Sequence, residues 1–573
     1  MTLKKFIFFS LLFLFNISPL LAQDNKIEDY PHNYFQWPVA AAPALAANFG
    51  ELRPNHYHMG LDCRTNQREN LPVFAAASGY VARVKIESFG FGRCLYINHP
   101  NGLTTLYAHL NDFNDAIEAY VKAEQYRQQK WKVDLEIPAG LLTVTKGQRI
   151  ANSGNTGGSQ GPHLHFEIRN TATDKVLNPL LFDMPIPDNI APDIIRLAVY
   201  DRCKSTYEQS PRIVSLQKIN GVYTPAGGNI NVTTEKVSFA VTAYDRYSGS
   251  TNQNGIFQGL LYDNNVFKCG FRLNNISYAE TRYLNAHIDY KTRSRGGPYL
   301  QHLSRLPGYP SGVYNHDESD GVITLVPGET HPILIKITDA NGNSNKIVFN
   351  LKATRFDDKD ERPKEGKEFM PGFVNIFETP DLKFFLPEKA LYDSFYFQFK
   401  KINSNSGQPV YLLHNTSVPV HTYFDVKIAA SFPQQYQDKI IMKRFYGSKD
   451  DYTAARPVQE ANGQTWYQGS FREFGNFQLF IDTVPPVVVP SGFWDGINAS
   501  GLRRIVFSVR DNAEDIKNFR ATVDGQWLRF TNDKGRNFIY EFDEHCPKGS
   551  HTLEVNVEDL AGNITTKTYR FTR

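Results

Sequence analysis

The chain alternates apolar and polar residues along most of its length, in short runs separated by Gly, Asn and Pro. Such runs are typical of strands that bury one face, and they predict strands at 81–86, 94–98 and 103–110. Residues 114–130 differ, because they are rich in Ala, Glu, Gln and Lys and predict a helix that Asn114 or Asp115 caps. We therefore expect a mainly β protein in which one helix projects from a β domain.

Two stretches of the chain, 186–353 and 484–573, repeat one pattern. An aspartate and a proline-containing segment stand at or just before the start of each, an alternating strand and a second aspartate follow, and a last strand enters an Asp-x-x-Gly-Asn turn. The corresponding aspartates are Asp188 and Asp482, Asp245 and Asp511, and Asp339 and Asp559. Period-two alternation that runs into a Gly-Asn turn is typical of a hairpin, so we expect two immunoglobulin-like β-sandwiches.

The remaining stretches complete the predicted organisation. A chain of 573 residues is too long for one hydrophobic core, so several domains are expected. Residues 23–185 carry all the candidate chemistry, and residues 354–372 form a charged, proline-containing linker. Residues 373–483 alternate again and predict a third accessory β domain, whose topology the sequence does not define.

Residues 1–22 have the layout of a secretory signal peptide, with Lys4 and Lys5 before an apolar run at 6–15 and the small residue Ala22. A membrane span is the alternative, but this run is short for one, and no later segment is long and apolar enough to cross a bilayer. We therefore expect an exported protein, periplasmic or extracellular and associated with the cell envelope, with no stable membrane span after signal cleavage.

Charge and cysteine content narrow the classes further. The net charge of +3 is near neutral for this length and argues against a nucleic-acid partner, because such proteins carry clustered basic surface. An exported chain permits disulfides, and the five cysteines allow pairs such as Cys63 with Cys94 and Cys203 with Cys269.

Three short stretches between residues 56 and 167 hold the candidate chemistry. His163 and His165 would point to one face of a strand, where they converge on a metal or a substrate, or else lie on the surface as ordinary polar residues. Asp62 follows His58 by four residues, and imidazole and carboxylate are both good zinc ligands. His58, Asp62 and one histidine of the pair would supply the three ligands of a catalytic zinc, which leaves a fourth position for water.

Two further histidines accompany this set. His56 competes with His58 as a ligand, although it lies six residues from Asp62. His109 is predicted to lie on a strand near the metal, where a hydrolase needs a group beyond the ligands to move protons and stabilise charge.

The three stretches, in this order, resemble the lysostaphin/LytM-type zinc metalloendopeptidase family, whose pattern is His-x-x-x-Asp, then Tyr-x-His-Leu, then His-Leu-His. Flanking segments at 71–81, 98–107 and 146–157 resemble the family as well. The resemblance covers about residues 49–179 and implies an antiparallel-β peptidase domain at 23–185 that carries the helical insertion.

The resemblance also implies the roles of individual residues. The implied zinc ligands are His58, Asp62 and His165, and the implied catalytic histidines are His109 and His163. The implied activity is hydrolysis of peptide bonds, usually in the stem peptides or cross-links of bacterial peptidoglycan, by water activated at Zn²⁺ with two assisting histidines. The chain departs from the family in an insertion between His109 and Lys146, which could line or narrow the substrate groove.

There are two alternatives to a peptidoglycan enzyme. The first is a non-catalytic cell-wall regulator or scaffold that binds a protein partner through the β domains, but the complete motif set favours an enzyme. The second is another metallopeptidase class, which would need a motif such as His-Glu-x-x-His, and this chain contains none.

Overall fold

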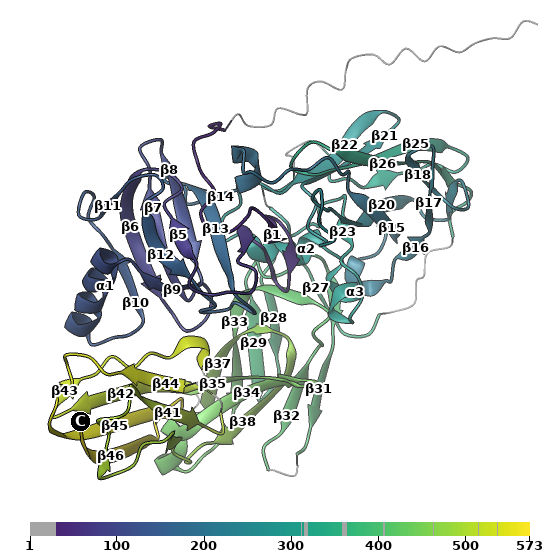
Figure 1. The fold of residues 1–573 in the computed structure, drawn as a ribbon. Coiled ribbons are helices and arrows are strands. Elements are labelled where there is room, and N and C mark those ends of the chain that lie inside the picture. The colour runs from purple at the N-terminus through teal and green to yellow at the C-terminus, as the bar shows by residue number, and fades with distance from the viewer. Residues whose placement is uncertain are drawn as a thin grey trace, which may run out of the picture.

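The computed structural model describes residues 30–310, 312–314, 319–357, 364–404, 407–461, 463–513, 515–535 and 537–573. The predicted signal peptide, residues 1–22, lies outside these ranges. Within them, no helix has the length and apolar character needed to cross a membrane. Strands dominate the elements, so the prediction of a mainly β protein is confirmed (Figure 1).

The N-terminal module, defined here as strands β1–β14, contains an antiparallel sheet whose strands differ in length. Their order is β1-β4-β13-β8-β7-β6-β10, with β14 beside β13 and β11 beside β6. A smaller sheet, β5-β12-β9, and the hairpin β2-β3 complete it. The bounds are β1 Leu45–Ala47, β2 Leu52–Arg53, β3 His56–Tyr57, β4 Leu61–Arg64, β5 Pro72–Phe74, β6 Gly79–Ile86, β7 Arg93–Asn98, β8 Leu103–Ala108, β9 Leu110–Phe113, β10 Val133–Glu136, β11 Thr143–Val144, β12 Arg149–Ser153, β13 His163–Asn170 and β14 Val176–Leu177, with the 3-10 helix η2 at Pro179–Phe182.

The register of this sheet brings distant motifs together. On β13, His165 is paired with Asp62 of β4 on one side and with Ala108 of β8 on the other. Because neighbouring strands lie only about 4.8 Å apart, this pairing places the third sequence motif between the first and the second.

The predicted helix is confirmed as α1, Asp115–Gln128. Asn114 caps it, since its side chain accepts a hydrogen bond from the Ile117 amide at 3.1 Å. The buried side of α1 presents Ile117 and Val121 to the core of the N-terminal module. A buried apolar stripe with a side-chain cap explains why this segment is helical inside a β module.

The first sandwich (β15–β26) and the C-terminal sandwich (β39–β46) share a strand order. One sheet contains β26-β25-β21-β22 in the first and β46-β45-β42-β43 in the second, and in each a short strand, β19 or β40, pairs in parallel with the last long strand. The other sheet contains β16-β15-β20-β23, with β24 beside β20, in the first and β39-β41-β44 in the second.

The first sandwich consists of β15 Asp193–Asp201, β16 Arg212–Val214, β17 Leu216–Ile219, β18 Val222–Pro225, β19 Ile230–Val232, β20 Lys236–Tyr244, β21 Gln258–Asp263, β22 Val266–Arg272, β23 Gln301–His302, β24 Ile323–Thr324, β25 Thr330–Thr338 and β26 Ser344–Ala353, with short helices η3 Thr206–Glu208, η4 Thr281–Tyr283, α2 Leu284–His287 and α3 Tyr290–Ser294. The C-terminal sandwich consists of β39 Val487–Pro490, β40 Ile497–Asn498, β41 Arg504–Arg510, β42 Ile516–Val523, β43 Gln526–Trp527, β44 Asn537–Glu541, β45 Ser550–Asp559 and β46 Ile564–Thr572, with η6 at Asp533–Gly535.

The middle module lies between them and has two five-stranded sheets, β28-β29-β33-β37-β36 and β31-β32-β38-β34-β35, and the pair β27-β30. Its elements are β27 Lys367–Phe369, β28 Asn375–Glu378, β29 Leu382–Leu386, β30 Phe395–Phe397, β31 Phe399–Ile402, β32 Val410–Leu413, β33 Pro419–Ala429, η5 Gln434–Lys439, β34 Ile440–Tyr446, β35 Lys449–Ala454, β36 Arg456–Gln459, β37 Thr465–Glu473 and β38 Gly475–Ile481. Both sheets contribute to one aromatic-rich core.

The cores of neighbouring modules are not fully separate. Phe49, Tyr57 and Met59 precede β4 in the N-terminal module, yet they pack in the hydrophobic core of the first sandwich. The segment that carries His58 is therefore anchored on both sides by the next module along the chain.

None of the five cysteines, all of which lie in described residues, forms a disulfide bond, so the suggested pairs do not form. Cys63 lies on β4 and Cys94 on β7, and β13 and β8 separate these strands in the sheet. Three strand spacings of about 4.8 Å exceed the reach of a disulfide, whose Cα atoms lie within roughly 7 Å. Cys203 is exposed and Cys269 is buried on β22, so that pair is wrong as well.

Candidate metal centre

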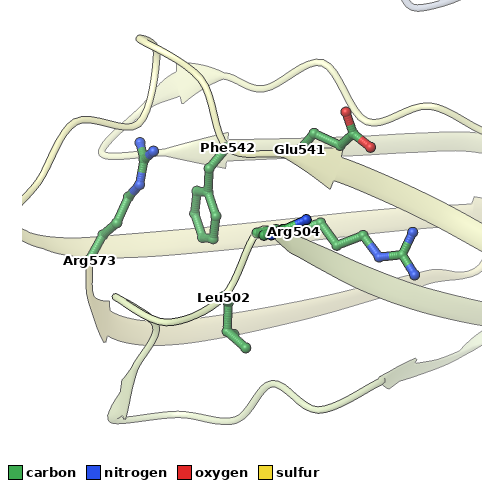
Figure 2. A pocket seen from close by; sticks show the side chains of 6 residues that line it. Leu502, Arg504, Glu541, Phe542 and Arg573 are labelled. Atoms are coloured by element: carbon green, nitrogen blue, oxygen red, sulfur yellow. The ribbon is translucent and has the colours of Figure 1, made fainter.

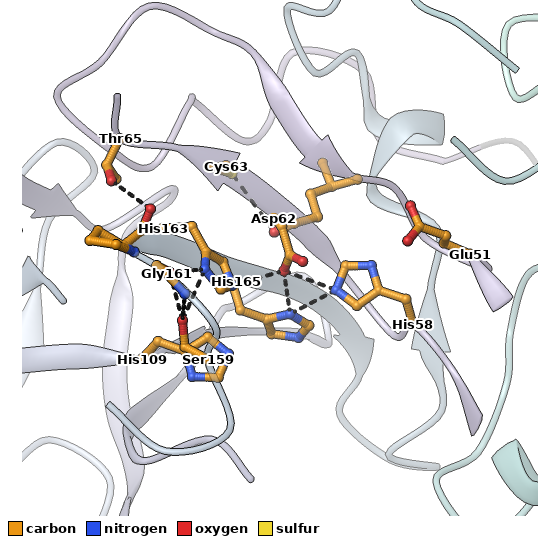
Figure 3. Close-up of polar contacts among 12 residues, drawn as sticks. Glu51, His58, Asp62, Cys63, Thr65, His109, Ser159, Gly161, His163 and His165 are labelled. Carbon is orange, nitrogen blue, oxygen red and sulfur yellow. Dashed lines mark hydrogen bonds and ion pairs between the residues drawn. The ribbon is translucent and has the colours of Figure 1, made fainter. Parts of the chain in front are cut away.

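Three side chains from two strands and a loop converge in the N-terminal module (Figure 3). The Nε2 of His58 lies 2.9 Å from Oδ1 of Asp62 and 3.1 Å from Nδ1 of His165. The Nδ1 of His165 lies 3.1 Å from the same Asp62 oxygen. All three residues are at most 8% exposed, and dashed lines in Figure 3 join Asp62 to both imidazoles and the two imidazoles to each other.

This donor set fits a zinc ion. Two imidazole nitrogens and a carboxylate oxygen are the ligands of many catalytic zinc sites, and bonds of about 2.0–2.2 Å in tetrahedral geometry place ligand atoms roughly 3.3–3.6 Å apart. The observed separations are slightly shorter. The Nδ1–H of His58 donates to the Asn48 carbonyl at 2.7 Å, which leaves the Nε2 lone pair directed at the cluster.

A carboxylate supports His165 from behind. Its Nε2–H donates to Oε1 of Glu167 at 2.9 Å, and the other Glu167 oxygen accepts from Nε of Arg169 at 2.7 Å. The hydroxyl of Tyr278, from the first sandwich, also donates to Glu167. A carboxylate behind a ligating histidine fixes its tautomer and orientation, so this arrangement leaves Nδ1 of His165 as the atom that faces the cluster.

The electrostatics of the cluster favour a cation. Burial opposes ionisation of Glu167, but Arg169 and His165 outweigh it and lower the pKa of Glu167 to about 2. Burial also raises the pKa of Asp62, yet His58 and the hydrogen bonds from His163 and His165 hold it well below its usual value. Burial disfavours a charged His165, but the bonds to Asp62 and Glu167 raise its pKa to about 9. Two ionised carboxylates thus attract positive charge at His165, which a proton or a metal can supply.

His109 and His163 lie next to this cluster. Their ring centroids are 4.8 Å apart, and Nε2 of His163 lies 3.3 Å from Oδ1 of Asp62. The Nδ1–H of His109 donates to the Thr156 carbonyl at 2.9 Å, and that of His163 donates to the Gly161 carbonyl at 2.8 Å. In its neutral form, a ring that donates from Nδ1 in this way keeps Nε2 as a proton acceptor. Burial, followed by the His163 and His165 charges, lowers the pKa of His109 to about 3.

The prediction that His109 lies on a strand is wrong. It stands between β8 and β9, which belong to different sheets, and its backbone has a φ of 59°. This left-handed conformation is uncommon for a residue with a Cβ atom and occurs often at functional sites. The turn moves the chain from one sheet to the other and aims the ring at His163.

The segment that holds these two histidines is itself held by the C-terminal sandwich. Residues 154–162 join β12 to β13 and supply the carbonyls that His109 and His163 contact. From η6, Asp533 accepts a hydrogen bond from the Gly157 amide at 2.8 Å. Nζ of Lys534 donates to the Ser159 carbonyl at 2.7 Å. A loop of the last sandwich therefore buttresses one side of the site.

The helix of the insertion, α1, also faces the C-terminal sandwich, which is the yellow module near it in Figure 1. Lys122 pairs with Asp543 at 2.9 Å, and the ring of Tyr126 stacks on His545 with centroids 3.5 Å apart. Gln125 accepts a hydrogen bond from Arg529. The contacts of α1 indicate a docking platform for the last sandwich, which the sequence did not suggest.

The structure shows which of the two candidate ligands, His56 or His58, lies in the cluster. His56 lies exposed on β3, and its Nδ1 contacts the Pro54 carbonyl, so it is not part of the cluster. Gly60 permits a close approach, because a Cβ there would lie 2.5 Å from the Phe166 carbonyl oxygen and 2.9 Å from the His165 ring.

A surface hollow of about 310 Å³ adjoins the site. It is lined by Ala46, Arg64, Thr65, Asn66, Gln67, Pro162 and His163. A larger hollow on the C-terminal sandwich, which Figure 2 shows between Leu502, Arg504, Phe542 and Arg573, contains none of the site histidines. Of these two hollows, the smaller one therefore borders the site, at His163.

Comparisons with known proteins give descriptions to three parts of the chain. The description "Peptidase family M23" matches residues 56–126 and 141–179, and the gap between these ranges falls within the insertion. "Zu5-like domain" matches residues 369–482, which gives a description to the accessory domain, and "Bacterial Ig-like domain" matches residues 502–572.

Individual relatives are similar to part of the chain. The chain is 36% identical over 136 residues to an uncharacterized metalloprotease of Haemophilus influenzae, covering 24% of this chain and 22% of that protein. It is 32% identical over 174 residues to the DD-carboxypeptidase/endopeptidase Mpg of Neisseria meningitidis, covering 30% of each. It is 26% identical over 188 residues to the peptidoglycan DD-endopeptidase ShyB of Vibrio cholerae, covering 31% and 38%.

The chain thus matches less than two fifths of the length of each of these relatives. The residues that match the description "Peptidase family M23", 56–126 and 141–179, include the converging histidines and Asp62. This chain carries a peptidase domain of family M23, of the lysostaphin/LytM type, followed by a Zu5-like domain and a bacterial Ig-like domain.

Proposed function

We propose that this chain is a zinc-dependent metalloendopeptidase in which Nε2 of His58, Oδ1 of Asp62 and Nδ1 of His165 hold the metal. The convergence of these three atoms within 3.1 Å of one another, inside a family M23 peptidase domain, is the observation that carries the proposal. When bound, zinc supplies Lewis-acid polarisation of a peptide carbonyl and makes water nucleophilic near neutral pH.

The chain's own residues orient these ligands and move protons. Asn48 and Glu167 fix the tautomers of His58 and His165, so that the correct nitrogen of each ring faces the cluster. His109 and His163 both expose Nε2, and we assign them to proton transfer and to stabilisation of the charge that develops on the cleaved peptide.

We propose peptidoglycan peptides, in stem peptides or cross-links, as the substrate. The support comes from relatives whose names include a DD-carboxypeptidase/endopeptidase and a peptidoglycan DD-endopeptidase. A cell-wall substrate agrees with the signal peptide predicted for residues 1–22 and therefore with activity in the periplasm or outside the cell.

The test is digestion of purified cell-wall sacculi by the full chain, before and after chelation. We expect release of soluble peptide-containing fragments, loss of release after chelation, and recovery when zinc is added back. Release that is unaffected by chelation would contradict a metal-dependent reaction, and no release by zinc-loaded protein would contradict the substrate.

A further inference from the structure

Each sandwich contains a cluster of three aspartates outside the site described above. The first triad is Asp188, Asp245 and Asp339, and the second triad is Asp482, Asp511 and Asp559. In each triad one carboxylate oxygen of every member lies within 4.8 Å of the others. The two triads occupy the matching positions of the sequence repeat.

The triads also occupy matching positions in the fold. Asp188 and Asp482 precede the first strand of their sandwich, β15 or β39. Asp245 and Asp511 directly follow β20 or β41. Asp339 stands in the turn between β25 and β26, and Asp559, the last residue of β45, stands at the turn into β46.

The hydrogen bonds of the two triads repeat as well. The Asn343 side chain donates to Oδ2 of Asp339 at 2.8 Å and to the Asp188 carbonyl at 3.4 Å. In the second sandwich Asn563 makes the same two bonds, to Asp559 at 2.9 Å and to the Asp482 carbonyl at 3.1 Å. The hairpin turn thus holds the third carboxylate against the start of the sandwich in both copies.

The other two carboxylates of each triad keep an oxygen without a protein partner. Among the described residues these are Oδ2 of Asp188 and of Asp482, and Oδ1 of Asp245 and of Asp511. Asp245 is 1% exposed and Asp482 is 0% exposed, so water in bulk cannot satisfy them. A buried, unpaired carboxylate oxygen costs free energy unless a donor or a cation faces it.

No positive side chain compensates the triads. Among the ion pairs of the described residues, none joins a Lys, Arg or His to any of the six aspartates. Burial, followed by the charges of Asp339 and Asp188, raises the pKa of Asp245 to about 8. Protein atoms alone therefore compensate these charges poorly.

A third acidic cluster, Asp543, Glu544 and His545, provides the contrast. There Lys122 pairs with both carboxylates at 2.9 Å, and Tyr540 donates to Asp543 at 2.6 Å. The negative charge of this cluster is neutralised by protein side chains. Unlike the two triads, it therefore needs no bound cation to compensate it.

We propose that each triad binds one divalent cation of the calcium type, with carboxylate oxygens of its three aspartates as ligands. Oxygen-only ligand sets suit hard cations, and Ca²⁺ tolerates the irregular geometry of loops better than Mg²⁺ does. The first aspartate of each triad lies where the chain enters a sandwich, between η2 and β15 or between β38 and β39. A bound cation there would fix the orientation of that sandwich relative to the preceding module.

The test is calorimetric titration of the zinc-loaded full chain with CaCl₂ in calcium-depleted buffer, with MgCl₂ as the comparison. We expect two Ca²⁺ per chain, with dissociation constants at or below the order of 10⁻³ M that extracellular modules show. Asp245→Asn and Asp511→Asn should each leave one site, and the double variant none. Asp495→Asn, an exposed aspartate of the C-terminal sandwich, is the matched control and should keep two.

Thermal unfolding separates a cation site from a purely structural cluster. Without calcium, Asp245→Asn should unfold at the same temperature as wild type or higher, because it removes repulsion between buried carboxylates. With calcium, the wild-type unfolding temperature should rise by several degrees more than that of the double variant. Absence of calcium binding, or two sites retained in the double variant, would overturn the proposal. A lower unfolding temperature of Asp245→Asn without calcium would overturn it as well.

Discussion

The two sides of the proposed metal centre are built differently. On the ligand side, Asp62 and His165 lie on adjacent strands, β4 and β13, whose backbone pairing sets them opposite each other. On the other side, His109 lies in a turn between two sheets, and the carbonyls that orient His109 and His163 belong to the loop at residues 154–162.

The two sides differ in the structural features that hold their side chains in place. The ligand side depends on sheet register and on a buried carboxylate, Glu167, that Arg169 neutralises. The side of His109 and His163 depends on a loop, and Asp533 and Lys534 of the C-terminal sandwich hold that loop. We infer that the ligand side determines whether metal binds, and that the other side determines how fast the bound metal works.

The largest expected effect follows removal of the shared ligand. Asp62 contacts both His58 and His165, so Asp62→Ala should lose most of the zinc and reduce activity to background. Zinc content by atomic absorption, beside the cooperative melt of the downstream modules, measures this. Wild-type zinc content in a folded Asp62→Ala protein would contradict the ligand assignment.

The next effect separates two histidines that share one strand face. His165→Ala should lose zinc, because Nδ1 of His165 faces the ligand cluster. His163→Ala and His109→Ala should keep zinc, while the cleavage rate falls by about 10²-fold or more, as is usual for proton-transfer and oxyanion groups. Zinc stoichiometry and rate should be measured on the same preparations. If His163→Ala loses zinc and His165→Ala keeps it, the roles are reversed.

A smaller effect should follow changes behind His165. Tyr278→Phe removes one hydrogen bond to Glu167 and keeps the ring that lies 4.9 Å from the Arg169 guanidinium. Loss of such a supporting partner typically costs about 10- to 100-fold in metal affinity or activity, and this neutral partner should lie at the lower end. Competition with a zinc chelator reports the affinity. An unchanged affinity would show that the first sandwich does not tune the metal.

The smallest expected effect concerns the C-terminal sandwich. Lys534→Ala removes the bonds from Nζ to the Ser159 carbonyl and the Asn155 side chain, so His163 should be less well oriented. We expect a few-fold lower kcat with unchanged zinc content, since a 1 Å misplacement of a catalytic group is already costly. Lys548→Ala, at an exposed lysine of the same sandwich, is the control and should match wild type. Loss of zinc in Lys534→Ala would contradict the separation of the two sides.

The sequence predicts the parts of this site that follow local rules. Alternation places His163 and His165 on one face of a strand. The same period continues to Glu167 and Arg169, so the pattern also places the carboxylate that supports His165 on that face, but it does not indicate its role. The helix also follows from composition, and its cap, Asn114, is one of the two residues that the sequence offered beside Asp115. These features depend on residues close together in the chain.

Long-range packing explains what the sequence did not predict. Tyr278 reaches Glu167 from 111 residues away, and Lys534 reaches Ser159 from 375 residues away, so no local pattern marks either contact. The turn at His109 is missed for another reason, because its apolar neighbours continue the strand pattern while the backbone changes sheets.

The most direct test of the central claim is mass spectrometry of the muropeptides that the zinc-loaded wild-type chain releases from purified sacculi. The account predicts products in which a stem or cross-link peptide bond is hydrolysed and the glycan chain is intact, and it predicts none from Asp62→Ala. Products with cleaved glycosidic bonds, or the same peptide products from Asp62→Ala, would contradict it.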